Sequence, residues 1–147
     1  MAEPIEVTLS QRRDYQFEIR FSAAGPALLA DEPAPLGTGE GPGPAQLLVA
    51  AVANCLSDSL LFALRKFGQA AEPMTAKASG SIGRNEHGRM RVQQIAVQIH
   101  LGRPAESLQH LDRILGQFED FCTVTQSVRA GIDVQVEVFD SSGTKLK

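Results

Sequence analysis

One long apolar segment, which begins at a proline, constrains the fold most. Residues 31–44 read DEPAPLGTGEGPGP, and four prolines with four glycines exclude regular structure there. Pro44 suits the first turn of a helix, where its nitrogen needs no partner, and Gly68 suits the end of one. The sequence therefore predicts a helix over 45–67, and because its first half is apolar on every side we expect it to be buried all round. Polar side chains at Asn54, Asp58 and their neighbours argue against a membrane span.

Period-two alternation on both sides of this helix predicts strands with one buried face. Before the helix, residues 5–9 and 15–21 form a predicted hairpin with its turn at 10–14, and 27–30 form a short third strand.

Further elements follow the predicted helix. The pattern predicts strands at 74–82, 90–101 and 132–139, a helix opened by Pro104, and a short helix that Asp120 caps. Strands in groups, rather than in alternation with helices, favour an α+β fold with antiparallel pairing. A length of 147 residues fits a single domain over 1–147.

Charge and composition exclude several classes of protein. Lys and Arg number 14 against 17 Asp and Glu, so the formal net charge is −3, and the basic residues are scattered. A nucleic-acid-binding protein needs a basic patch, and base stacking needs aromatic rings; this chain has no Trp and one Tyr. The start, MAEPIEVTL, has no basic and apolar leader, so we expect a cytoplasmic protein without a membrane partner.

The chain has two cysteines, Cys55 and Cys122, separated by 67 positions. They form no CxxC motif, and the three histidines show no ligand spacing with them, so we expect neither a metal nor another cofactor. A reducing compartment keeps thiols free, so we do not expect the cysteines to form a structural disulfide. They are therefore either inert core residues or a chemical pair.

Local sequence supports different readings of the two thiols. If Asp120 caps the short helix, Cys122 lies in its first turn, where free amides favour a thiolate; the alternative is a small buried apolar residue. Cys55 lies in mid-helix, and Asp58 at i+3 would raise the pKa of its thiol. A reactive Cys55 therefore needs a cation from elsewhere, and Arg20 on a polar strand face is the candidate, with an ordinary solvated arginine as the alternative.

The glycine-rich run at 37–43 lacks the GK[ST] that a phosphate-binding loop needs at a helix start. It is interpreted as a flexible loop that leads into the helix.

Three blocks together resemble the OsmC/Ohr superfamily of peroxide-reducing proteins, over nearly the whole chain. They are DEPAPLG at 31–37, GPGPAQLLVAAVANC ending at Cys55, and EDFCTVTQSV around Cys122. The resemblance implies an OsmC-like α+β fold, with antiparallel sheets packed around long central helices, in an intertwined homodimer.

The resemblance also implies a reaction and its partners. Cys55 would attack a small-molecule peroxide and become a sulfenic acid, Cys122 would condense with it to a disulfide, and a cellular dithiol would reduce that disulfide. In many members a Glu ten residues before the first cysteine holds an N-terminal arginine against the thiolate. Ala45 stands at that position here, and Glu32 or Glu40 are the carboxylates that could substitute.

Two other function classes remain. One is a non-enzymatic protein of the same fold, which binds a small hydrophobic ligand at the dimer interface. The other is a cysteine hydrolase, but nothing in the sequence places a histidine beside either cysteine.

Overall fold

The structure is a computed structural model and describes residues 2–147. By its internal contacts the chain divides into two compact units, one up to Leu47 and one from Leu48 to Lys147. Each unit is described by itself. The single domain over 1–147 stays a prediction.

The first unit is a small antiparallel sheet followed by a loop. Its strands are β1 (Thr8–Arg13), β2 (Gln16–Arg20) and β3 (Leu28–Ala30), in the order β1-β2-β3. The expected hairpin and the short third strand are confirmed, but the first strand lies at 8–13 instead of the predicted 5–9. The predicted turn at 10–14 is wrong, because β1 continues to Arg13 and only Asp14, with φ 47°, and Tyr15 make the turn. β1 is exposed along its whole length, so polar side chains are compatible with strand there.

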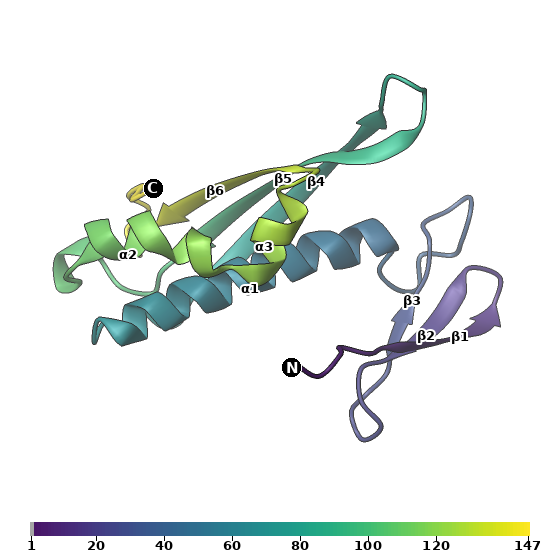
Figure 1. Ribbon diagram of the computed structural model, residues 1–147, viewed down its shortest axis with the longest axis horizontal. Helices are drawn as coiled ribbons and strands as arrows, with labels where there is room; N and C mark the ends of the chain where they lie inside the picture. Colours follow the sequence, from purple (N-terminus) through teal and green to yellow (C-terminus); the bar gives the residue numbers. More distant parts are fainter. Residues whose placement is uncertain (1) are drawn as a thin grey trace. The chain divides into compact units, whose positions relative to one another are not determined.

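The second unit contains most of the central helix and a three-stranded sheet. The helix α1 runs over Pro44–Lys66 and is followed by β4 (Thr75–Arg84) and β5 (Met90–His100). The chain then passes through two 3-10 turns, η1 (Ala105–Ser107) and η2 (Phe118–Phe121). Around them lie α2 (Leu111–Gln117), α3 (Thr123–Val128) and β6 (Asp133–Phe139). In Figure 1 α1 lies along one face of the sheet, with the shorter helices beside it.

The core of this unit lies between that sheet face and α1. Burial alternates along β5, where Ile95, Val97 and Ile99 are buried and the residues between them are not. The buried residues of α1 recur at every fourth position: Val52, Leu56, Leu60 and Leu64. The sheet thus has one apolar face, and a single stripe of α1 packs in the same core.

Two predictions about this unit need correction. β4 and β5 pair antiparallel as expected, but β5 and β6 pair parallel, since the chain crosses over through the short helices before β6. Pro104 opens only the 3-10 turn η1. α2 begins at Leu111, because Leu108 is extended and His110 adopts φ 61°, and both break the helical path.

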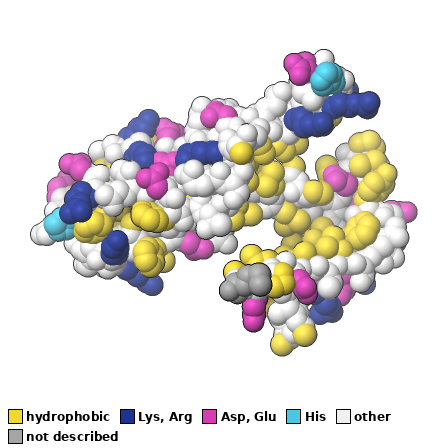
Figure 2. All heavy atoms as spheres, viewed as in Figure 1, with side chains coloured by type: hydrophobic (Ala, Val, Ile, Leu, Met, Phe, Trp, Pro, Cys, Tyr) yellow, Lys and Arg dark blue, Asp and Glu magenta, His cyan; other side chains and the backbone are white. Residues whose placement is uncertain are grey.

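The prediction that α1 is buried all round is also wrong for the single chain. Outside its buried stripe the helix is half-buried or exposed, and the Phe62 side chain is 69% exposed. Figure 2 shows hydrophobic side chains at the surface over the C-terminal half of α1, next to Lys and Arg side chains. By length and composition α1 could cross a membrane. This is weak evidence for a membrane span, because the core helix of a soluble protein can have the same length and composition.

Candidate functional site

Cys55 lies in the middle of α1, directly before the fully buried Leu56. Its side chain is half-buried and packs against the apolar core of the second unit. The neighbouring Asp58 accepts a hydrogen bond from the Asn54 amide at 3.2 Å. Cys55 therefore has apolar core residues on one side and polar residues of its own helix nearby.

Cys122 is fully buried where η2 ends and α3 begins. Asp120 lies inside η2, so the prediction that it caps the third helix is wrong. Cys122 itself occupies the N-cap position, with φ −82° and ψ 96°, and its carbonyl accepts from the Gln126 amide at 2.9 Å. The thiol donates a hydrogen bond to the Thr125 hydroxyl oxygen at 3.0 Å, and Thr125 is fully buried as well.

The fold brings the two cysteines together. Burial raises the pKa of the Cys55 thiol, and the hydrogen bond and charge of the adjacent Cys122 side chain raise it further. The backbone amides of Val124 and Thr125 act in the opposite direction without reversing the pKa shift. The pKa of Cys55 is raised, the direction that was expected from Asp58, but the causes are burial and Cys122 and not Asp58.

A buried ion cluster holds the segment that carries Cys122. Glu119 in η2 pairs with Arg129 at 2.5 Å and more closely with Lys147, and its side chain is only 14% exposed. Burial disfavours the Glu119 carboxylate, but the hydrogen bonds and charges of Lys147 and Arg129 outweigh burial and hold its pKa below the usual value. Arg129 also donates to the Val134 carbonyl at 3.1 Å, which ties α3 to β6.

The other predicted site residue, Arg20, belongs to the first unit. It ends β2 and pairs with Glu18 of the same strand at 2.8 Å, with half of its side chain exposed. Glu40 was one of the two carboxylates expected to hold Arg20 in place of the Glu that is missing at position 45. It pairs with Arg13 at 3.4 Å instead. The contribution of Arg20 to the chemistry of Cys55 stays a prediction.

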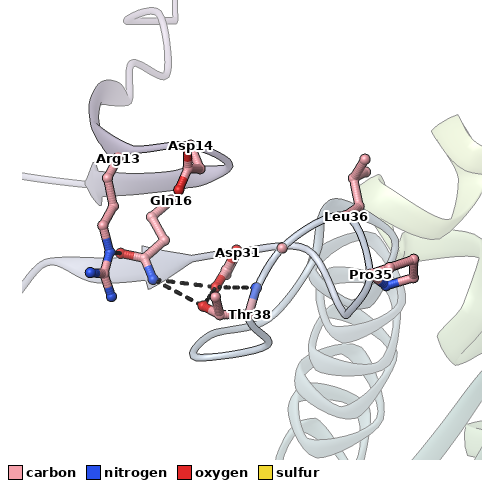
Figure 3. Close-up of a pocket in the computed structure, with 8 residues that line it drawn as sticks. Arg13, Asp14, Gln16, Asp31, Pro35, Leu36 and Thr38 are labelled. Carbon is pink, nitrogen blue, oxygen red and sulfur yellow. Dashed lines mark hydrogen bonds between the residues drawn. The ribbon is translucent and has the colours of Figure 1, made fainter.

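The glycine-rich loop of the first unit is held by a buried carboxylate. Asp31 accepts hydrogen bonds from the Thr38 hydroxyl at 2.7 Å, the Glu32 amide at 2.7 Å and the Glu40 amide at 3.2 Å. These bonds, the one from Thr38 foremost, lower the pKa of Asp31 to about 2 even though burial opposes them. Figure 3 shows Asp31, Thr38 and Gln16 joined beside a cavity of about 290 Å³. The interpretation of this run as a flexible loop is therefore replaced by a loop with defined anchors.

Two glycines allow this loop to close. A Cβ on Gly41 would lie 1.9 Å from the Leu29 carbonyl oxygen, and one on Gly37 would lie 2.2 Å from that of Glu32. Close backbone approach therefore explains glycine at both positions.

The histidines lie apart from the features described above. His87 is exposed in the turn between β4 and β5, His100 stacks on Phe139 at 4.9 Å, and His110 precedes α2. Within residues 2–147 no three His, Cys, Asp or Glu side chains form a group that could hold a metal ion.

The family model described as OsmC-like protein matches residues 37–137, which include both cysteines. The chain belongs to the OsmC family. The α+β fold agrees with that of OsmC and Ohr proteins of known structure, so the predicted family and fold class are confirmed. No curated protein sequence matches this one.

Solved structures of other OsmC-family proteins resemble the chain over almost its full length. An OsmC-like protein of unknown function from Vibrio cholerae is 20% identical, with a TM-score of 0.79, covering 94% of this chain and 100% of that one. An organic hydroperoxide resistance protein OsmC from Legionella pneumophila is 16% identical, with a TM-score of 0.72, covering 94% and 98%. The organic hydroperoxide resistance protein OhrB of Bacillus subtilis is 17% identical, with a TM-score of 0.69, covering 90% and 96%.

The site also contains a residue that the sequence analysis did not single out. Thr125 lies three positions after Cys122, and residues at this spacing share one face of a helix. The spacing alone would have indicated a contact between the two side chains. Burial of the hydroxyl, which makes the contact obligatory, depends on the tertiary fold.

Proposed function

We propose that this OsmC-family protein is a thiol-dependent peroxidase that reduces organic hydroperoxides or hydrogen peroxide. The observation that carries the proposal is that the fold places two free cysteines beside each other inside one subunit. An inert core cysteine needs no sulfur neighbour, whereas a cysteine that forms a sulfenic acid needs one to regenerate it. Relatives named organic hydroperoxide resistance proteins share the fold and support the substrate class.

Two balanced steps describe the oxidation. The Cys55 sulfur attacks the peroxide O–O bond, so Cys55–SH and ROOH give Cys55–SOH and ROH. The Cys122 sulfur then attacks the Cys55 sulfur, the S–O bond breaks, and the Cys122 proton leaves with the hydroxide as water. A cellular dithiol reduces the resulting disulfide by thiol–disulfide exchange. No other cofactor takes part in these steps.

The first step needs a cation near Cys55. Its neighbours in the second unit raise the pKa of the thiol, and only the thiolate is a good nucleophile. We assign this role to Arg20, which Glu18 holds at 2.8 Å. Glu18 then does for Arg20 what a Glu at position 45 does in relatives that have one.

We further propose that the protein acts as a homodimer in the cytoplasm. The exposed face of α1 includes Phe62, and a second copy of the helix would cover it. Two free thiols are typical of a reducing compartment, which also contains dithiols that can reduce the Cys55–Cys122 disulfide.

The Cys122→Ser variant tests the assignment of roles. With one equivalent of cumene hydroperoxide we expect Cys55 to form a sulfenic acid that dimedone traps, seen as one mass adduct per subunit. Wild type should form the Cys55–Cys122 disulfide without an adduct. An adduct on Cys122 in wild type, or no oxidation of Cys55 in either protein, would contradict the proposal.

A second function is favoured by the raised pKa of Cys55 and by Ala45, which both disfavour a reactive thiolate. In this case the protein binds a small hydrophobic ligand at the dimer interface and does no chemistry. Native mass spectrometry would then show a retained ligand, and thiol titration would find two unreactive cysteines. Turnover of peroxide that depends on Cys55 would exclude it.

A further inference from the structure

Thr125, which contacts Cys122, has a buried hydroxyl that accepts a hydrogen bond from the cysteine. Thr125 and Cys122 are both fully buried, and the Cys122 thiol donates to the Thr125 oxygen across 3.0 Å. A thiol has one proton to donate, so this bond commits it. The Cys122 sulfur can then offer only lone pairs to its other neighbour, Cys55.

We propose that Thr125 is a positioning residue, which binds the Cys122 proton and thereby turns a sulfur lone pair toward Cys55. The inference rests on the peroxidase proposed above and extends it to a residue that contacts neither substrate nor the peroxidatic sulfur through its side chain. Because Thr125 accepts the Cys122 proton, a hydrogen bond between the two thiols can run only from Cys55 to Cys122.

This direction has opposite effects on the two steps. In the resting protein a bond in this direction favours the protonated form of Cys55, which agrees with the raised pKa of its thiol. After oxidation the same lone pair of Cys122 is already directed at the Cys55 sulfur that it must attack. Thr125 thus slows the first step and prepares the second.

Removal of the hydroxyl should reverse the direction. In Thr125→Val, which keeps the shape of the side chain, the Cys122 proton loses its acceptor, and the neighbouring Cys55 sulfur can accept it instead. A donor stabilises a thiolate, so the Cys55 thiolate becomes easier to form, while the Cys122 lone pair turns away from Cys55.

The first measurement needs no peroxide. Alkylation of Cys55 by iodoacetamide, followed peptide by peptide in mass spectrometry, gives its rate against pH. At neutral pH we expect Thr125→Val to react roughly threefold faster than wild type, the effect of one weak hydrogen bond to a charged sulfur. Thr125→Ser keeps the hydroxyl and should match wild type. Thr123→Val removes an exposed hydroxyl of the same helix and should match it as well.

The second measurement follows disulfide closure after one equivalent of cumene hydroperoxide. Thr125→Val should close the disulfide several-fold more slowly and trap more sulfenic acid with dimedone, and Thr125→Ser should restore the rate. Circular dichroism and thermal melting establish that the variants fold; if Thr125→Val does not, the comparison of Thr125→Ala with Thr125→Ser replaces it.

The outcomes separate this inference from the proposed function. Equal or slower alkylation in Thr125→Val, or a Thr125→Ser variant that behaves like Thr125→Val, would overturn the role of the hydroxyl whatever the peroxide result. Faster alkylation together with no oxidation by peroxide in any variant would support the hydrogen-bond direction and overturn the peroxidase.

Discussion

The reactivity of Cys55 depends on what surrounds one sulfur atom. Burial and the adjacent Cys122 raise the pKa of its thiol, so the second unit by itself favours the unreactive form. A peroxidase at neutral pH needs the thiolate, and a positive charge nearby is the common means of obtaining it. The proposed reactivity of Cys55 therefore depends on Arg20.

Arg20→Gln tests that dependence. If the guanidinium stabilises the thiolate, its loss leaves burial and Cys122 unopposed, and the midpoint of Cys55 alkylation against pH rises above the ordinary thiol value of 9.0. The rate of oxidation by peroxide at neutral pH should fall about tenfold or more. Arg12→Gln changes an exposed arginine of the neighbouring strand and should leave both rates as in wild type. Equal midpoints in Arg20→Gln and wild type would remove Arg20 from the site.

The sequence indicates that Cys55 and Cys122 could act as a pair. It does not determine which side chains surround them. Cys55 and Cys122 are 67 positions apart in the sequence. They meet because the crossover between β5 and β6 contains α3, which Cys122 directly precedes, and no local pattern encodes this crossover. The same holds for Asp120: an acidic residue before a helix is a good capping signal, but here Asp120 lies inside the 3-10 turn η2, and Cys122, directly after that turn, takes the cap position.

The loop between β3 and α1 is irregular as predicted, but it has more anchors than its composition indicates. Its composition predicts irregular structure, and it has none of the periodicity of a helix or strand. Asp31 nevertheless anchors it with several hydrogen bonds, and the tight approach of Gly41 to Leu29 closes it. Composition identifies a loop, whereas the anchors of that loop depend on which polar side chain the sheet buries.

Asp31 makes this loop sensitive to acid. Its folded pKa of about 2 lies below the ordinary value of 3.8, so its contribution to stability is complete above 3.8 and is lost as the pH falls toward 2. Asp31→Asn should lower the melting temperature at neutral pH by a few degrees and show a weaker dependence on pH within that window.

Asp140 provides the comparison, because it has the same lowered pKa of about 2 and caps a different turn, with Ser142 and Thr144. Asp31→Asn should therefore flatten only part of the acid transition, and Asp31→Asn with Asp140→Asn should flatten more of it. An acid transition identical in wild type and Asp31→Asn would show that the Asp31 carboxylate does not anchor the loop.

The central helix was predictable to within a residue at each end because Pro44 and Gly68 mark its limits. The start of α2 was not, because the apolar spacing from Leu108 to Phe118 suits a helix, while His110 in the left-handed region interrupts it. The parallel β5–β6 pair was not predictable either, since strand patterns show which face is buried and not the direction of pairing.

At the level of the whole molecule, the exposed face of α1 is a surface that the second unit, residues 48–147, leaves uncovered. The helix buries one stripe in its own core and leaves Phe62 exposed among Asp58, Leu61 and Arg65. An apolar side chain on such a face is expected to be covered by another surface. A homodimer around this face is the arrangement that the family resemblance also implies.

Phe62→Glu tests the dimer. A charge at the centre of a helix–helix contact is costly, so we expect sedimentation at micromolar concentration to show a dimer for wild type and a monomer for Phe62→Glu. Phe121→Glu replaces an equally exposed phenylalanine of η2 and should remain dimeric. A dimeric Phe62→Glu variant, or a monomeric wild type, would contradict an interface on this face.

Turnover of peroxide tests the central claim most directly. Consumption of cumene hydroperoxide and of hydrogen peroxide is measured with excess dithiothreitol, for wild type and for Cys55→Ser. We expect sustained turnover by wild type and a loss of about 100-fold or more in Cys55→Ser, because the serine hydroxyl stays protonated and does not attack the O–O bond. A Cys55→Ser protein that consumes either peroxide at the wild-type rate would contradict the account.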